Sequence, residues 1–131
     1  MPEPRQANVS ENGRSAFAVT INVSGHVIEG DETKELGGEN LGPAPYDTLL
    51  AALGECTAMT VRWYAREHKF PLQKVEVDLT HHKEGRTDVF TKTISLQGDE
   101  LTLEQKTKLV EIAAKCPVQR TLEGTPVIRT V

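Results

Sequence analysis

Two different periods of apolar and polar residues run along the chain. Residues 16–28, AFAVTINVSGHVI, alternate around β-branched side chains and a glycine. This alternation predicts two short strands of a hairpin. Residues 29–45 then gather glycine, proline and acidic residues, which predicts an irregular loop.

Residues 46–68, YDTLLAALGECTAMTVRWYAREH, change to a helical period. The apolar positions recur at steps of three and four, at Leu49, Leu50, Leu53, Ala58, Val61 and Tyr64. Asp47 falls in the first turn, where a carboxylate complements the helix dipole. Gly54 lowers helix propensity, so we expect another backbone or a partner helix to approach closely there. Pro71 ends this helix.

The second half of the chain returns to strands. Residues 74–82 and 89–98 alternate and predict an antiparallel pair, with 83–88 as the turn. A helix follows over 102–116, opened by a capping box of Thr102 and Gln105 and ended by Pro117. Residues 125–131, TPVIRTV, suggest a last strand. This order predicts an α+β fold with mostly antiparallel sheets.

Length and charge restrict the classes of function. A chain of 131 residues predicts a single domain spanning 1–131. The net charge of −4, with both signs interspersed, leaves no basic footprint for nucleic acid or an anionic membrane. No apolar stretch resembles a signal peptide or is long enough to span a bilayer. We therefore expect a cytoplasmic protein, in a compartment that keeps thiols reduced.

The chain contains only two cysteines, Cys56 and Cys116. Cys56 lies in the third turn of an apolar helix, which disfavours its thiolate unless a cation is brought to it. Cys116 is expected at the carboxyl end of a helix, where the dipole also disfavours a thiolate. On this basis Cys56 attacks and Cys116 serves as a second thiol, if either reacts. The alternative is that both are inert residues that fill space in the core.

The histidines do not form a convincing metal site. His81 and His82 are adjacent on a predicted strand, so their side chains point to opposite faces. The closely spaced ligand pairs of structural zinc sites are absent from the sequence. We expect no metal and no other cofactor.

Two segments together resemble the osmotically inducible protein C (OsmC) family, which includes the organic hydroperoxide resistance proteins. They are GGENLGPAPYDTLLAALGECTAMT, residues 37–60, and IAAKCPVQRTL, residues 112–122. The resemblance extends over nearly the whole chain, with the predicted strands in order between them. It implies an OsmC-like α+β fold in an intertwined homodimer, with the sheets wrapped around central helices.

The resemblance also implies an activity, that of a thiol peroxidase which reduces organic hydroperoxides to alcohols. Cys56 matches the peroxidatic cysteine and Cys116 the resolving one, with a disulfide as the product of resolution. A dithiol reductant of lipoyl type would reopen that disulfide. Asp47 lies near the family's carboxylate, which is usually a glutamate, and Arg14 is the best match for its arginine. No metal, haem or flavin is implied.

One departure from the family pattern concerns Gln119, which stands where a histidine is expected. Gln119 keeps hydrogen-bonding capacity but cannot titrate near neutral pH. The function that competes with a peroxidase is a non-catalytic dimer that binds a small hydrophobic ligand and keeps both cysteines inert.

Overall fold

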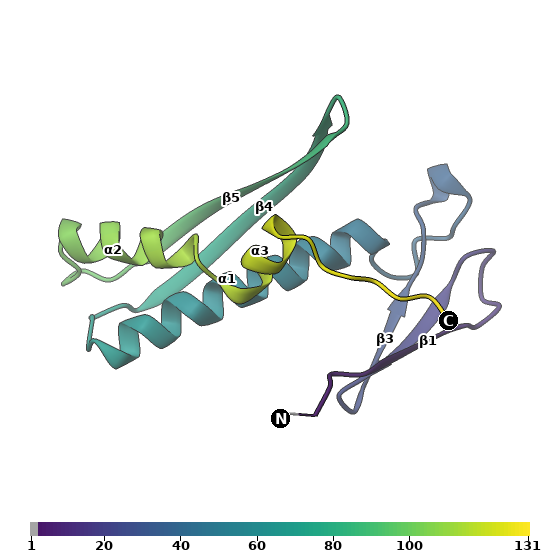
Figure 1. The fold of residues 1–131 in the computed structure, drawn as a ribbon, viewed down its shortest axis with the longest axis horizontal. Helices are drawn as coiled ribbons and strands as arrows, with labels where there is room; N and C mark the ends of the chain where they lie inside the picture. Colours follow the sequence, from purple (N-terminus) through teal and green to yellow (C-terminus); the bar gives the residue numbers. More distant parts are fainter. Residues whose placement is uncertain (1–2) are drawn as a thin grey trace. The chain divides into compact units, whose positions relative to one another are not determined.

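The computed structural model describes residues 3–131 and divides into two compact units, residues 1–49 and residues 50–131. Figure 1 shows the elements of each unit, which are described separately below. Both units combine antiparallel strands with helical segments. The predicted α+β class is therefore confirmed.

The first unit contains a three-stranded antiparallel sheet of order β1-β2-β3. The predicted hairpin is confirmed as β2 (Val19–Val23) and β3 (His26–Gly30). The sequence did not predict β1 (Ala7–Glu11), which pairs with β2. All five residues of β1 are exposed, so this strand carries no apolar face from which it could have been recognised.

A loop that contains the short 3₁₀ helix η1 (Lys34–Leu36) follows β3 and is organised by Asp31. The buried Asp31 carboxylate accepts hydrogen bonds from the Ser15 hydroxyl and from the amides of Glu32, Glu39 and Leu41. Burial raises the pKa of Asp31, but these four hydrogen bonds outweigh burial and leave the pKa below its ordinary value. Asp31 therefore holds the loop as a carboxylate.

The long helix α1 (Pro45–Glu67) matches its prediction to within one residue at each end. Its buried residues recur with helical spacing, at Leu53, Gly54, Thr57, Val61 and Ala65. At Gly54 a Cβ atom would lie 2.6 Å from Cδ1 of Leu79. Within this chain the expected close approach is therefore made by a side chain of β4 and not by another backbone.

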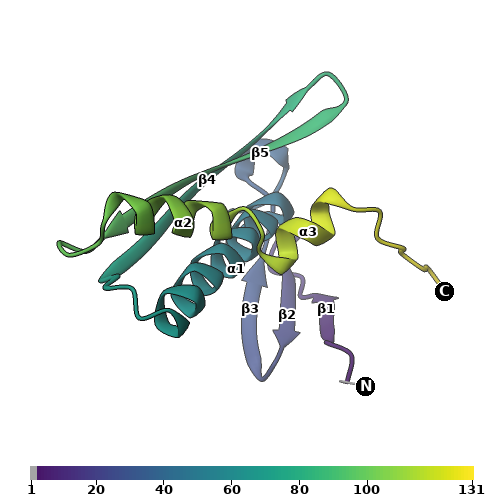
Figure 2. The ribbon, with the colours of Figure 1, turned by 60° about the vertical axis from the view of Figure 1, so that its left-hand side comes forward.

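The second unit also contains the antiparallel pair β4 (Lys74–Glu84) and β5 (Thr87–Gln97). Figure 2 shows this hairpin together with α1 and α2 (Leu103–Ala113). The buried core of this unit joins α1 to α2 and to the segments around them, through Val61, Ala65, Leu72, Leu101, Leu109 and Ala113. Partly buried residues of β4 and β5 pack against this core at Val75, Ile94 and Leu96. The predicted capping box of Thr102 and Gln105 is present at the start of α2.

The end of the chain differs from its prediction. Helix α2 ends at Ala113, and Pro117 begins a third helix, α3 (Pro117–Glu123), with Cys116 as its N-cap. A proline fits the first position of a helix because its missing N–H has no intrahelical partner there. Residues 125–131 form no strand. The expected helix end at Pro117 and the expected last strand were therefore wrong.

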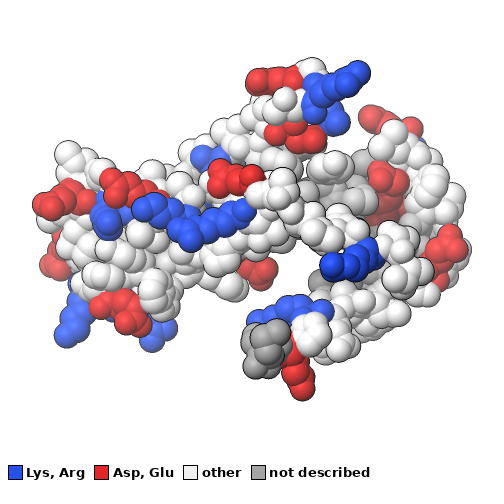
Figure 3. Space-filling model, viewed as in Figure 1, with Lys and Arg blue, Asp and Glu red and all other residues white. Residues whose placement is uncertain are grey.

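Charged side chains of both signs are interspersed over α2 and the neighbouring surface (Figure 3). Among the residues described, none of the helices combines the length and the apolar character that crossing a membrane would require.

Candidate active site

The two cysteines come together at the first turn of α3. Cys56 lies near the middle of α1 and is half-buried, whereas Cys116 is fully buried. The amide of Val118 donates to Cys56 Sγ at 3.5 Å, and the amide of Gln119 donates to Cys116 Sγ at 3.4 Å. Both thiols are free, and both sulfurs accept from amides of the same helical turn. The structure therefore brings together two residues that are sixty positions apart in the sequence.

Two further side chains complete the surroundings of Cys116. The Thr57 hydroxyl lies 3.5 Å from Cys116 Sγ and donates to the Leu53 carbonyl at 2.7 Å. The Lys92 ammonium, from β5, donates to Thr57 Oγ1 at 2.9 Å and to the Ala113 carbonyl at 2.7 Å. Helices α1 and α2, strand β5 and the start of α3 thus all contribute to this site.

The surroundings of Cys116 favour its thiolate. Burial raises the pKa of Cys116. Hydrogen bonds and one positive charge outweigh burial and lower this pKa below its ordinary value; they come from Thr57, the Gln119 amide, Cys56 and Lys92. The sequence-based argument that a negative helix end disfavours this thiolate was wrong, because Cys116 precedes α3 instead of ending α2.

Lys92 was not among the residues predicted from the sequence, although the sequence contains a signal for it. Along β5, Phe90, Ile94 and Leu96 alternate with exposed residues and share one face of the strand. Lys92 occupies the same face, where this alternation calls for an apolar residue. A charged residue at such a position indicates a paired or functional group.

Gln119 contributes its backbone amide to the site, while its side chain lies along α3. Its Nε2 donates to Glu123 at 3.2 Å. Its Oε1 is the one buried side-chain nitrogen or oxygen, within the described part of the chain, that has no hydrogen-bond partner. The sequence analysis selected Gln119 because its side chain cannot titrate. Its contact with Cys116, through the backbone amide, was not predicted.

The other two predicted residues, Arg14 and Asp47, belong to the first unit. The Arg14 guanidinium forms an ion pair with Glu29. The Asp47 carboxylate, in the first turn of α1, accepts a hydrogen bond at 3.0 Å from the amide of Ala44, the residue that precedes the helix. Each therefore has another partner within its own unit, and a role for either beside the thiols stays a prediction.

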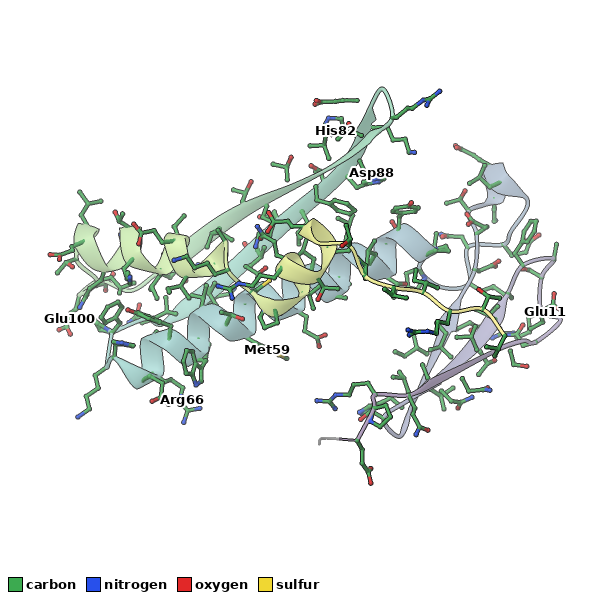
Figure 4. All side chains as sticks on the ribbon, in the orientation of Figure 1. Glu11, Met59, Arg66, His82, Asp88 and Glu100 are labelled. Atoms are coloured by element: carbon green, nitrogen blue, oxygen red, sulfur yellow. The ribbon has the colours of Figure 1, made fainter. Side chains whose placement is uncertain are left out.

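An apolar groove runs along α1 on a different face from its buried residues. It is lined by residues of α1 and β4: Ala58, Met59, Arg62, Trp63, Arg66, Glu67 and Val75. Met59 and Trp63 are 63% and 60% exposed. In Figure 4, Met59 and Arg66 project from the side of α1 that faces away from β4 and β5.

The chemistry available at the paired thiols is that of sulfur. A thiolate is the reactive form of cysteine, and a neighbouring thiol allows a disulfide to form. Within residues 3–131, no three His, Cys, Asp or Glu side chains gather as ligands of a metal would. The fold and the site define an α+β protein with a paired-thiol centre.

The chain belongs to the OsmC-like protein family, whose sequence model matches residues 37–131. This match includes both cysteines, α1 and all of the second unit. The predicted family is thereby confirmed. No curated protein matches the chain in sequence.

Solved structures of related proteins share the fold. An OsmC-like protein from Mycoplasma pneumoniae superimposes with a TM-score of 0.73 at 17% identity, covering 95% of this chain and 90% of that one. The organic hydroperoxide resistance protein OsmC from Legionella pneumophila gives 0.64 at 19% identity, over 93% and 90%. The organic hydroperoxide resistance protein OhrB of Bacillus subtilis gives 0.62 at 18% identity, over 91% of each chain.

Proposed function

We propose that this protein is a cysteine-based peroxidase that reduces organic hydroperoxides to alcohols. The observation that carries the proposal is the pairing of Cys56 with Cys116, each sulfur held by an amide of α3. Relatives of the same fold that are named organic hydroperoxide resistance proteins support the choice of substrate.

Cys56 is the attacking residue in this proposal because it is the more exposed of the two thiols. Its thiolate attacks one peroxide oxygen, the O–O bond breaks, and the alkoxide takes a proton to leave as an alcohol. Cys56 becomes a sulfenic acid. The Cys116 thiolate then attacks the Cys56 sulfur, the S–O bond breaks, and the hydroxide leaves as water after protonation. A dithiol, in our proposal of lipoyl type, reduces the disulfide and is itself oxidised.

A homodimer and a positioning role for Arg14 and Asp47 belong to the same proposal. The exposed Met59 and Trp63 on α1 support the dimer, because burying them would remove apolar surface from water. We propose that the two compact units act as one domain within this dimer. Arginine suits a place beside a thiolate because its planar guanidinium can bind sulfur and a carboxylate together and stays charged.

The test begins with fully reduced protein, freed of reductant and mixed anaerobically with a slight excess of cumene hydroperoxide. Free thiols and intact mass are followed for the wild type and for Cys56→Ser and Cys116→Ser. We expect the wild type to lose both thiols without added mass. Cys56→Ser should consume no peroxide, and Cys116→Ser should accumulate one added oxygen atom.

Variants of the first unit extend this test. Arg14→Ala and Asp47→Asn should slow peroxide consumption, while Arg86→Ala, in the exposed turn between β4 and β5, serves as the control. Wild-type protein that keeps both thiols reduced at millimolar peroxide would exclude the peroxidase. The binding alternative would then gain if apolar ligands raised the melting temperature of this unreactive protein, with the groove along α1 as their site.

A further inference from the structure

Lys92 lies at a position where a lysine is unfavourable unless its ammonium has hydrogen-bond acceptors. On the same face of β5 its neighbours are Phe90 and Ile94, and in the antiparallel ladder it lies opposite Leu79 of β4. A half-buried ammonium among apolar side chains requires hydrogen-bond acceptors. Lys92 finds two, Thr57 Oγ1 at 2.9 Å and the Ala113 carbonyl at 2.7 Å.

The close packing of α1 on β4 makes the first of these contacts possible. Gly54 precedes Thr57 by one helical turn and meets Leu79, the residue opposite Lys92 in the ladder. Because Gly54 has no side chain, α1 can approach β4 closely enough for the Lys92 ammonium to reach the fully buried Thr57 hydroxyl.

The hydroxyl of Thr57 has one hydrogen but makes contact with three groups, the Leu53 carbonyl, the Cys116 sulfur and the Lys92 ammonium. An ammonium can only donate, so the hydroxyl oxygen accepts from Lys92 whatever the state of the thiol. While Cys116 is a thiol, its S–H can donate to Thr57 Oγ1 and the hydroxyl donates to Leu53. Once Cys116 is a thiolate, the hydroxyl can rotate and donate to the sulfur, while its oxygen still accepts from the Lys92 ammonium.

We propose that Lys92 is a positioning residue which, through the Thr57 hydroxyl, keeps Cys116 ready to act as a thiolate. Lys92 supplies both a positive charge close to the sulfur and the orientation of the hydroxyl that contacts it. The consequence for catalysis rests on the proposed function: the Lys92–Thr57 pair speeds closure of the disulfide, in which Cys116 attacks the sulfenic acid of Cys56 and water leaves.

The other charged and titratable groups around Lys92 are consistent with this role. Burial lowers the pKa of Lys92, while the negative charges of Cys116, Cys56 and Glu123 raise it, and the net shift is downward. Cys56 comes from α1, Cys116 precedes α3, and Glu123 lies on α3. Two of these three groups are thus the thiols of the candidate site.

The experiment measures the ionisation of Cys116 directly, without any peroxide. In full-length protein carrying Cys56→Ser, Cys116 is the only thiol, and its thiolate is followed by ultraviolet absorbance against pH. Lys92→Met keeps most of the stem and removes the charge, while Thr57→Val removes the hydroxyl at nearly the same size. Lys74→Met, an exposed lysine of β4 with a 60% exposed side chain, is the matched control.

We expect Lys92→Met and Thr57→Val each to move the titration midpoint of Cys116 to higher pH, and Thr57→Ser to restore it. Lys74→Met should leave the midpoint unchanged. Circular dichroism and urea unfolding identify any variant that fails to fold, in which case Lys92→Gln or Thr57→Ala, which also remove the charge or the hydroxyl, replaces it. A merely structural role would lower stability without moving the midpoint, and that result would overturn the proposal.

The kinetic consequence is measured separately, with both cysteines present. After a stoichiometric addition of peroxide, the conversion of sulfenic acid to disulfide at pH 7 should slow by about tenfold in Lys92→Met, the order expected for one nearby charge. If the wild type does not react with peroxide, the proposed function fails while the titration still decides the role of Lys92.

Discussion

The contact between Gly54 and Leu79 gives the sharpest test of how the second unit is packed. Alanine is a better helix former than glycine by about 1 kcal/mol, so Gly54→Ala should stabilise α1 if nothing lay against it. The added methyl group, however, would lie 2.6 Å from Leu79 Cδ1, well inside van der Waals contact. Because Cδ1 is the far end of a flexible side chain, Leu79 must move away within the packed unit, and overpacking that forces such a shift costs about 1–3 kcal/mol. We therefore expect Gly54→Ala to lower the free energy of unfolding by about 0–2 kcal/mol.

A double-mutant cycle separates the two opposing effects. Leu79→Ala removes the clashing methyl groups, so in that background Gly54→Ala should raise the free energy of unfolding by about 1 kcal/mol. The coupling between the two substitutions should therefore be about 1–3 kcal/mol. Ala51→Gly, at an exposed position of the same helix, measures the propensity effect alone.

The assay is urea unfolding followed by circular dichroism and by the fluorescence of Trp63, at one protein concentration because dimerisation would add to stability. A coupling free energy close to zero would refute the packing argument. It would also weaken the explanation of how Lys92 reaches Thr57, since both depend on the close approach of α1 to β4.

Two further predictions concern Asp31 and Thr102. Because the pKa of Asp31 is lowered in the folded protein, its carboxylate stabilises the fold above the unfolded value of 3.8, and this contribution is lost as the pH falls below that value. Asp31→Asn should therefore lower the free energy of unfolding in urea at neutral pH, and it should lose less stability than the wild type on acidification. Glu35→Gln, exposed in the same loop, should do neither. An Asp31→Asn variant that loses as much stability in acid as the wild type would contradict this. Thr102→Ala removes the hydroxyl of the capping box and should lower the free energy of unfolding by about 1 kcal/mol. Thr102→Ser keeps a hydroxyl and should retain most of the wild-type stability. Thr107→Ala, at an exposed position of the same helix, is the control. Equal losses in Thr102→Ala and Thr107→Ala would show that the cap contributes nothing.

Local sequence patterns determined most of the elements of this protein. The helical spacing of apolar residues located α1, and strict alternation located β2, β3, β4 and β5. The capping box of Thr102 marked the start of α2. These elements could be predicted because each is specified by residues that are close together in the chain and share one period. The same local reading also selected Cys56 and Cys116, since they are the only cysteines.

The tertiary structure alone decided the environment of those cysteines. A proline both ends a preceding helix and suits the first turn of the next, so Pro117 could not show from sequence on which side of a helix Cys116 lies. Lys92 reaches Thr57 from a different element, thirty-five positions away in sequence. Charge, burial and hydrogen bonding at Cys116 depend on such distant contacts, and the local spacing of apolar residues does not predict these contacts. The sequence thus determined which sulfur atoms were available, whereas the packing of α1, α2 and β5 placed around Cys116 the groups that favour its thiolate.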